Sequence, residues 1–247
     1  MNRTPPAAAT AVVLPGTGSD DVFVRAVFEQ PLDDIGVRLV APAPVSGSPL
    51  VASYLDAFDA AAASAAGPIL VGGVSFGAHL ASTWALRNQA RCAGLLVALP
   101  AWNGPAGDAT AALAARASAA LVREHGLEGA LRLAIDGIAP WLAEELSRAW
   151  RRHGDQLADG LETAAAYPAP ELPALGTLDV PVGIAACTDD DIHPAEVACA
   201  WADALPYASV QDTTLAEVGA DPANLGRATV AAYQRARAAA GSSVGWV

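Results

Sequence analysis

The chain has 247 residues, of which 53% are hydrophobic, and carries a net charge of −12. This length suffices for one large α/β domain, or a domain with an insertion, around a sizeable core. The 14 basic residues are all arginine and face 26 acidic residues. Nucleic-acid binding, which needs clustered cations, is therefore not expected. The absence of lysine also excludes Schiff-base and P-loop lysine chemistry.

Membrane insertion and disulfide bonding are not expected. Even the apolar residues 57–73 are interrupted by Asp59 and Pro68, so no run is long enough to span a bilayer. The N-terminal residues lead into the first predicted strand with no separate apolar segment, and we expect a soluble cytoplasmic protein. Buried reduced thiols are favoured for three widely spaced cysteines in apolar settings: Cys92, Cys187 and Cys199.

Short apolar runs alternate with helix-like segments, which predicts an α/β protein with a mostly parallel, doubly wound sheet. Helical spacing and many alanines are found at Val51–Ala66 and Ala78–Gln89. The six predicted strands are Thr10–Leu14, Val37–Ala41, Pro68–Val74, Ala93–Leu99, Val180–Ala186 and Ala208–Asp212.

The alternation breaks between Ala101 and Gly176. This segment holds four helix-like stretches and then a proline-rich return at residues 167–173. A helical insertion between two strands is expected to cap their carboxyl ends, where open α/β sheets place their sites. We therefore predict a core of residues 1–100 and 177–247, and a helical cap of residues 101–176. The predicted cap helices are Ala109–Glu124, Leu127–Ile135, Pro140–Arg152 and Gln156–Ala166.

The segment Gly73-Val74-Ser75-Phe76-Gly77 lies between the third predicted strand and a predicted helix. Strand, glycine-flanked turn and helix are the context that a G-x-S-x-G nucleophile elbow requires. The small residues allow a tight turn that holds Ser75 in a strained conformation with its hydroxyl exposed. Ser75 is therefore a candidate nucleophile.

With these features the chain resembles the α/β-hydrolase fold from Ala11 to Ala240. The loop from Leu14 to Ser19 resembles the oxyanion loop of that family, and residues 187–194 are similar to its acid loop, G-x-x-D-x-[I/V]-x-P. An amphipathic helix from Pro222 to Ala240 closes the chain, as in the family. The resemblance implies that Ser75 is the nucleophile, Asp190 the triad acid, and the amides of Thr17 and Phe76 the oxyanion donors.

The base histidine of that family follows the last strand, here near residues 215–221, where Gly219-Ala220 stands instead. His79, one helical turn past Ser75, is expected to be structural. His125 and His153 each precede a glycine at a predicted helix end, where a cation suits the helix dipole, although His153 could also reach the site.

His193 is the remaining candidate base, because it follows Asp190 by three residues in the loop that should border the site. It could replace the missing histidine, oriented by Asp189 or Asp191. The alternative is a loop or capping histidine before the helix that Pro194 opens. Glu217 and Asp221 could also act as bases, but a carboxylate of ordinary pKa is a poor base for serine.

No metal or cofactor is expected. The three carboxylates of residues 189–191 would point in different directions, and Gly16-x-Gly18 lacks the rest of a dinucleotide fingerprint. Trp102 is a candidate substrate-binding residue, and other tryptophans of the cap could line an apolar acyl pocket, with core packing as the alternative: Trp141 and Trp150. A solvated helix face is expected for the only basic cluster: Arg148, Arg151 and Arg152.

Two functions remain open from the sequence. The first is a serine-dependent hydrolase of an ester or thioester of a small apolar acyl group, with His193 as a relocated base. The second is a non-catalytic protein of this fold that binds a small molecule or a protein partner after loss of the usual histidine. The intact elbow favours the first, and the missing histidine favours the second.

Overall fold

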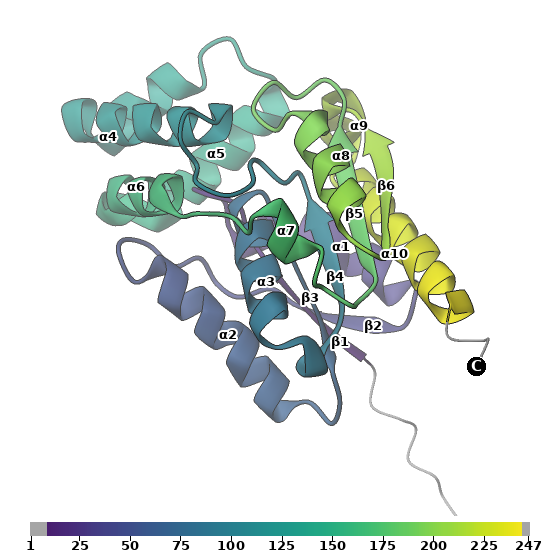
Figure 1. Ribbon diagram of the computed structural model, residues 1–247. Coiled ribbons are helices and arrows are strands. Elements are labelled where there is room, and N and C mark those ends of the chain that lie inside the picture. Colours follow the sequence, from purple (N-terminus) through teal and green to yellow (C-terminus); the bar gives the residue numbers. More distant parts are fainter. Residues whose placement is uncertain (1–8, 244–247) are drawn as a thin grey trace, which may run out of the picture.

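The computed structural model describes residues 9–243, which form a six-stranded sheet with helices on both faces (Figure 1). The strands are β1 (Ala9–Leu14), β2 (Val37–Val40), β3 (Ile69–Val74), β4 (Cys92–Ala98), β5 (Val182–Cys187) and β6 (Ala208–Thr213). They lie in the order β2-β1-β3-β4-β5-β6, and all neighbours are parallel. The predicted α/β class and parallel sheet are therefore confirmed.

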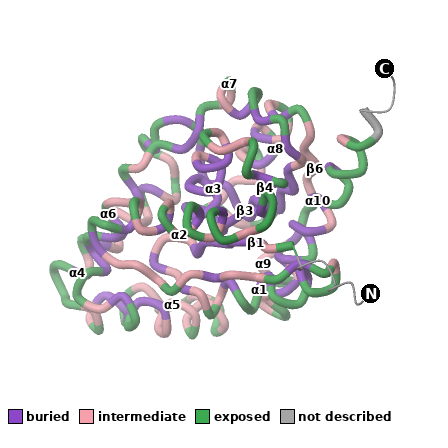
Figure 2. The backbone as a smooth tube through the Cα atoms, turned by 90° about the horizontal axis from the view of Figure 1, so that it is seen from below, coloured by how far each residue is buried: buried purple, intermediate pink, exposed green. Residues whose placement is uncertain are grey.

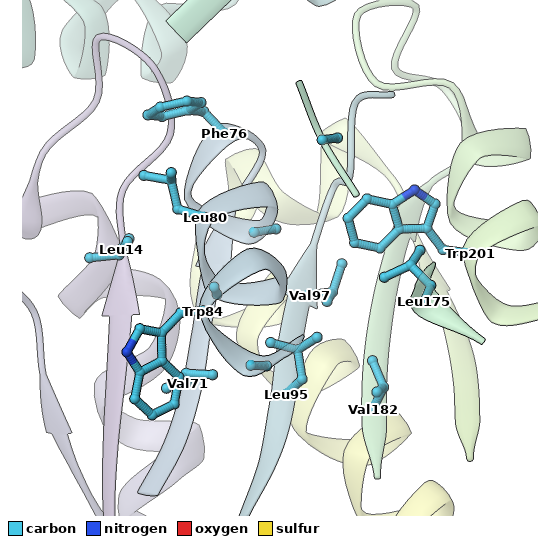
Figure 3. Close-up of a cluster of buried hydrophobic side chains, with 14 of the residues drawn as sticks. Leu14, Val71, Phe76, Leu80, Trp84, Leu95, Val97, Leu175, Val182 and Trp201 are labelled. Carbon is cyan, nitrogen blue, oxygen red and sulfur yellow. The ribbon is translucent and has the colours of Figure 1, made fainter. Parts of the chain in front are cut away.

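Alternate side chains of each strand enter two separate cores, as expected for a sheet covered on both faces. Val71 and Leu95 face one core, whereas Leu70 and Leu96 face the other. Figure 3 shows part of the first core, where Leu80 and Trp84 of α3 (Phe76–Arg87) point towards the strands. Figure 2 shows the buried central strands β3 and β4 between layers whose outer surfaces are exposed.

The first core is covered by α2 (Leu50–Ser64), α3 and α8 (Ala195–Ala204), and the second by α1 (Asp21–Asp33), α9 (Leu215–Ala220) and α10 (Ala223–Ser243). In the sheet, β1 lies between β2 and β3. The chain therefore passes from β1 to the neighbouring strand on one side, β2, and then crosses to the strand on the other side, β3. The loops after β1 and β3 therefore flank a topological switch point, where open α/β sheets form a crevice.

Four helices lie between β4 and β5, in the segment predicted to be a cap: α4 (Thr110–Ala134), α5 (Pro140–His153), α6 (Leu157–Ala166) and α7 (Leu172–Leu175). We call them the insertion. The two helices predicted before and after His125 are one element, α4, interrupted by the non-helical Gly126. Figure 1 shows α4, α5 and α6 together at the end of the molecule to which the β6 arrow points, which is the carboxyl end of the parallel strands.

Candidate active site

Ser75 occupies a sharp turn between β3 and α3. Its φ of 52° and ψ of −116° lie in a region that residues with a side chain rarely adopt. Both flanking glycines are required sterically. A Cβ on Gly73 would come within 2.1 Å of Gly77, and one on Gly77 within 2.6 Å of the Leu14 carbonyl oxygen. The sequence motif is therefore a consequence of close packing within the turn, at Gly73, and against the end of β1, at Gly77.

His193 lies next to Ser75, at a hydrogen-bond distance of 3.0 Å between its Nε2 and the serine Oγ. Its other nitrogen, Nδ1, lies 2.8 Å from Oδ2 of Asp190. Since an ionised carboxylate can only accept, Nδ1 carries the proton and Nε2 is left to accept from the Ser75 hydroxyl. This is the tautomer that a general base for serine requires.

Asp190 and His193 are held by their own loop, which follows β5. Oδ1 of Asp190 accepts the amides of Ile192 and His193, at 2.8 and 3.3 Å, leaving Oδ2 free for the imidazole. Burial alone would raise the pKa of Asp190, but the hydrogen bond and charge of His193 and these two amides bring it below its ordinary value. Asp190 is therefore ionised at neutral pH.

The expectation that Asp189 or Asp191 orients His193 is wrong. Oδ1 of Asp189 accepts the Leu215 amide at 2.7 Å instead, and Asp191 is exposed. The physical reason is the turn that Asp190 makes with the amides of its own loop, which directs only this carboxylate towards the imidazole.

The loop after β1 approaches Ser75 from the opposite side of the switch point. A Cβ on Gly16 would lie 3.5 Å from Cβ of Ser75 and 3.3 Å from the Val74 carbonyl oxygen. The turn closes with a hydrogen bond from the Ser19 amide to the Gly16 carbonyl, which does not use the Thr17 amide. Phe76 is the first residue of α3, so its amide has no acceptor within the helix.

A small cavity of about 10 Å³ adjoins Thr17 and Phe76. Its other walls are mostly apolar and come from α2 and α6, including Leu50, Tyr54 and Leu157. This volume holds about one water molecule.

Comparisons with known proteins bear on the fold. No protein-family model and no curated protein matches the sequence. Solved structures do match: a thermophilic esterase from Thermogutta terrifontis has a TM-score of 0.68 at 16% identity, covering 93% of this chain and 90% of that chain. The chain has the α/β-hydrolase fold.

Two further α/β-hydrolase-fold structures agree with this assignment. The enol-lactonase from Burkholderia xenovorans LB400 has a TM-score of 0.62 at 14% identity, covering 96% of this chain and 90% of that chain. The thioesterase domain from the curacin biosynthetic pathway has a TM-score of 0.58 at 18% identity, covering 92% of each chain.

The region in which the α/β-hydrolase pattern has its histidine contains α9 here. Thr214 and Glu217 cap this helix reciprocally. Gly219 packs so closely against Trp141 of α5 that a Cβ would lie 2.3 Å from the indole nitrogen. The Glu217 carboxylate accepts the Thr214 amide at the N-terminus of α9, and Asp221 pairs with Arg227. Neither carboxylate is therefore placed as an alternative base for Ser75.

His79 and Trp102 pack together beneath the site. His79 is fully buried, and its Nε2 accepts the Ala101 amide at 3.1 Å. Burial and the nearby charge of His193 lower the pKa of His79 to about 3, so it is neutral. The Trp102 indole lies edge-on to this ring, with 4.4 Å between ring centroids, and is 5% exposed. In this structure Trp102 is therefore a buried core residue that packs against His79.

Neither of the other two histidines is hydrogen-bonded to Ser75, although His153 lines the small cavity beside Thr17 and Phe76. His153 Nε2 donates to the Ser19 carbonyl at 2.9 Å, which leaves Nδ1 to accept from the Ser46 hydroxyl at 2.8 Å. His125 is on the exposed side of α4 beside Gly126.

Residues 9–243 also bear on the expectations for metal binding, membrane insertion and the cysteines. Within this part of the chain, no group of three or more His, Cys, Asp or Glu side chains is placed to hold a metal ion, and no helix is both long and apolar enough to cross a bilayer. All three cysteines are free, as expected, but Cys199 is exposed rather than buried. It lies on the outer side of α8, where the apolar composition of the helix does not reveal which face meets solvent.

The sequence did not reveal the role of Asp20, which follows the loop after β1. Its side chain is fully buried and accepts hydrogen bonds from Arg148 and Arg152. The prediction of a solvated arginine face is therefore wrong for Arg148, which is partly buried. Arg152 is exposed, as expected, although it also pairs with Asp20, and Arg151 is half exposed and pairs with Glu128. An acidic residue before a helix indicates an N-cap, but nothing local indicates its distant partners.

Proposed function

We propose that this protein is a serine-dependent hydrolase of esters or thioesters, with Ser75 as nucleophile, His193 as general base and Asp190 as the orienting acid. The observation that carries the proposal is the continuous hydrogen-bonded line from Ser75 Oγ to His193 Nε2 and from His193 Nδ1 to Asp190. Similar folds in an esterase, a thioesterase domain and an enol-lactonase support the same reaction class.

In the proposed first step, His193 Nε2 takes the Ser75 proton while Oγ bonds to the substrate carbonyl carbon. The carbonyl electron pair moves to its oxygen, and the amides of Thr17 and Phe76 receive that negative charge. When the intermediate collapses, the bond to the leaving alkoxide or thiolate breaks, and His193 gives its proton to the leaving group. An acyl-Ser75 ester remains.

Water completes the cycle by the same route. His193 takes a proton from a water molecule whose oxygen attacks the acyl carbon, and the second intermediate releases the carboxylic acid. Ser75 recovers its proton from His193. Throughout both halves, the Asp190 carboxylate holds the Nδ1 proton and stabilises the imidazolium that forms on His193.

The cavity beside Thr17 and Phe76 supports a small, apolar acyl group, because its walls are mostly apolar and its volume, about that of one water molecule, favours the shortest acyl chains. In this account the insertion acts as the cap over the acyl group, and the substrate is a small molecule. The alternative of a non-catalytic binder drew on the missing histidine after β6. His193 within hydrogen-bond reach of Ser75 weakens that argument.

The test is steady-state hydrolysis of p-nitrophenyl esters from acetate to octanoate, together with a short-chain acyl thioester. We expect kcat/KM to be highest for the short acyl groups, and turnover to disappear in Ser75→Ala. Equal turnover in wild type and Ser75→Ala, or a preference for octanoate, would contradict the nucleophile or the acyl-size assignment, respectively.

A further inference from the structure

One helix of the insertion, α5, holds the loop of residues 16–19, which we call the oxyanion loop in keeping with the proposed function. The loop is followed by Asp20, the N-cap of α1. Oδ1 of Asp20 accepts the amides of Val22 and Phe23 at 3.0 and 3.1 Å. These bonds fix the direction in which the chain leaves the loop.

The same Asp20 carboxylate is bound by two arginines of α5. Arg148 donates through Nε to Oδ2 at 3.0 Å and through Nη2 to Oδ1 at 2.7 Å. Arg152 donates to Oδ2 at 3.0 Å and also pairs with Asp21 at 2.8 Å. Arg148 is itself held by Glu145. Bidentate arginine–carboxylate pairs fix orientation as well as distance, and this carboxylate is fully buried.

Two further contacts from α5 reach the loop itself. His153 binds the Ser19 carbonyl at 2.9 Å, and the indole of Trp150 lies against Gly18, where a Cβ would be 3.1 Å from its nitrogen. Gly18 has a φ of +68°, so this close approach occurs at a position that already favours glycine. Every residue from Gly18 to Asp20 is thus in contact with α5.

We propose that Asp20, Arg148, Arg152 and His153 form a clamp through which the insertion positions the Thr17 amide for the oxyanion. None of the four is hydrogen-bonded to Ser75 in the structure, and each acts through the loop, so they are positioning residues; His153 in addition lines the cavity beside Thr17 and Phe76. Oxyanion donors act only when they are fixed at the site where negative charge develops. If the loop were released from α5, the substrate would still bind, but the Thr17 amide would no longer be fixed where the negative charge develops. The clamp's catalytic role rests on the proposed hydrolase function.

The test compares Arg148→Met with Arg151→Met. Both variants remove an arginine of α5 that makes a bidentate pair with a carboxylate. Arg148 pairs with Asp20 and also with Glu145 on its own helix, whereas Arg151 pairs with Glu128 on α4 and has no hydrogen bond to the loop. With p-nitrophenyl acetate we expect Arg148→Met to lower kcat about tenfold with KM changed less than twofold. A boronic acid that forms a tetrahedral adduct on Ser75 should lose affinity to a similar extent. Arg151→Met should behave as wild type, and Arg148→Lys should recover part of the loss.

Hydrogen exchange separates the clamp from the proposed function, since it needs no turnover. Amides of residues 17–20 should exchange faster in Arg148→Met than in Arg151→Met. Equal exchange in the two variants would overturn the clamp even in an active enzyme. Faster exchange with unchanged kcat and boronate affinity would overturn its catalytic role. A wild type without Ser75-dependent turnover would refute the hydrolase, and the positioning role with it, but not the physical clamp measured by exchange.

Discussion

Replacing Asp190 by asparagine should abolish most activity without unfolding the loop, and the hydrogen bonds of the site explain why. Oδ1 accepts the amides of Ile192 and His193, and an asparagine would keep its carbonyl oxygen there. Its NH₂ group would then face His193 Nδ1, in the position where Oδ2 now accepts at 2.8 Å. The imidazole would adopt the tautomer with a proton on Nε2, which cannot take the Ser75 proton.

Loss of the correct tautomer in a serine–histidine–aspartate site lowers the rate by about 10⁴-fold, equivalent to roughly 5 kcal/mol of transition-state stabilisation. We expect a loss of this order in kcat/KM for p-nitrophenyl acetate in Asp190→Asn at neutral pH. Asp191→Asn is the matched control, because it makes the same substitution one residue away on an exposed side chain. The reasoning is refuted if Asp190→Asn keeps activity within tenfold of this control.

Two further predictions concern stability. Gly77→Ala would bring a Cβ within 2.6 Å of the Leu14 and Pro15 carbonyl oxygens and should cost about 1–3 kcal/mol or more, whereas Gly67→Ala, which meets nothing within 4 Å, should not; equal urea midpoints for the two variants would contradict this. The pKa of His79 is about 3 in the folded protein and near its ordinary value of 6.5 in the unfolded chain. The contribution of His79 to the free energy of unfolding is therefore fully present above pH 6.5 and is lost as the pH falls, by up to about 1.4 kcal/mol per pH unit down to pH 3. Urea unfolding at pH 7 and 5 should show this loss in wild type relative to His79→Gln, and parallel pH profiles would rule it out.

Much of the core could be predicted from the sequence because its signals are local. Most strands are short apolar runs, and the glycine-flanked serine is a motif of five consecutive residues, although the clash that requires Gly77 comes from Leu14 of β1. The helix α1 has a weaker signal in the sequence, since it contains Pro31 and mixes polar with apolar residues. A proline in this position usually argues against a helix.

The proposed base, His193, and the acid, Asp190, could both be named from the sequence, but not the fact that they pair with each other. The spacing of His193 from Asp190 places both in one loop, but which of three adjacent carboxylates faces the imidazole depends on the turn that Asp190 makes with its own amides. The contacts between α5 and Asp20 could not be predicted from the sequence. Asp20 and Arg148 are 128 residues apart, and only the folded chain brings an N-cap and an arginine of the insertion together.

The central claim is that His193, placed in the acid loop, activates Ser75. Its most direct test is labelling of the purified protein with a fluorophosphonate, followed by mass spectrometry of the modified peptide. We predict labelling at Ser75 in wild type and in His125→Ala, whose histidine is exposed on α4, and none in Ser75→Ala or in a folded His193→Ala. Undiminished labelling of Ser75 in His193→Ala would contradict the account.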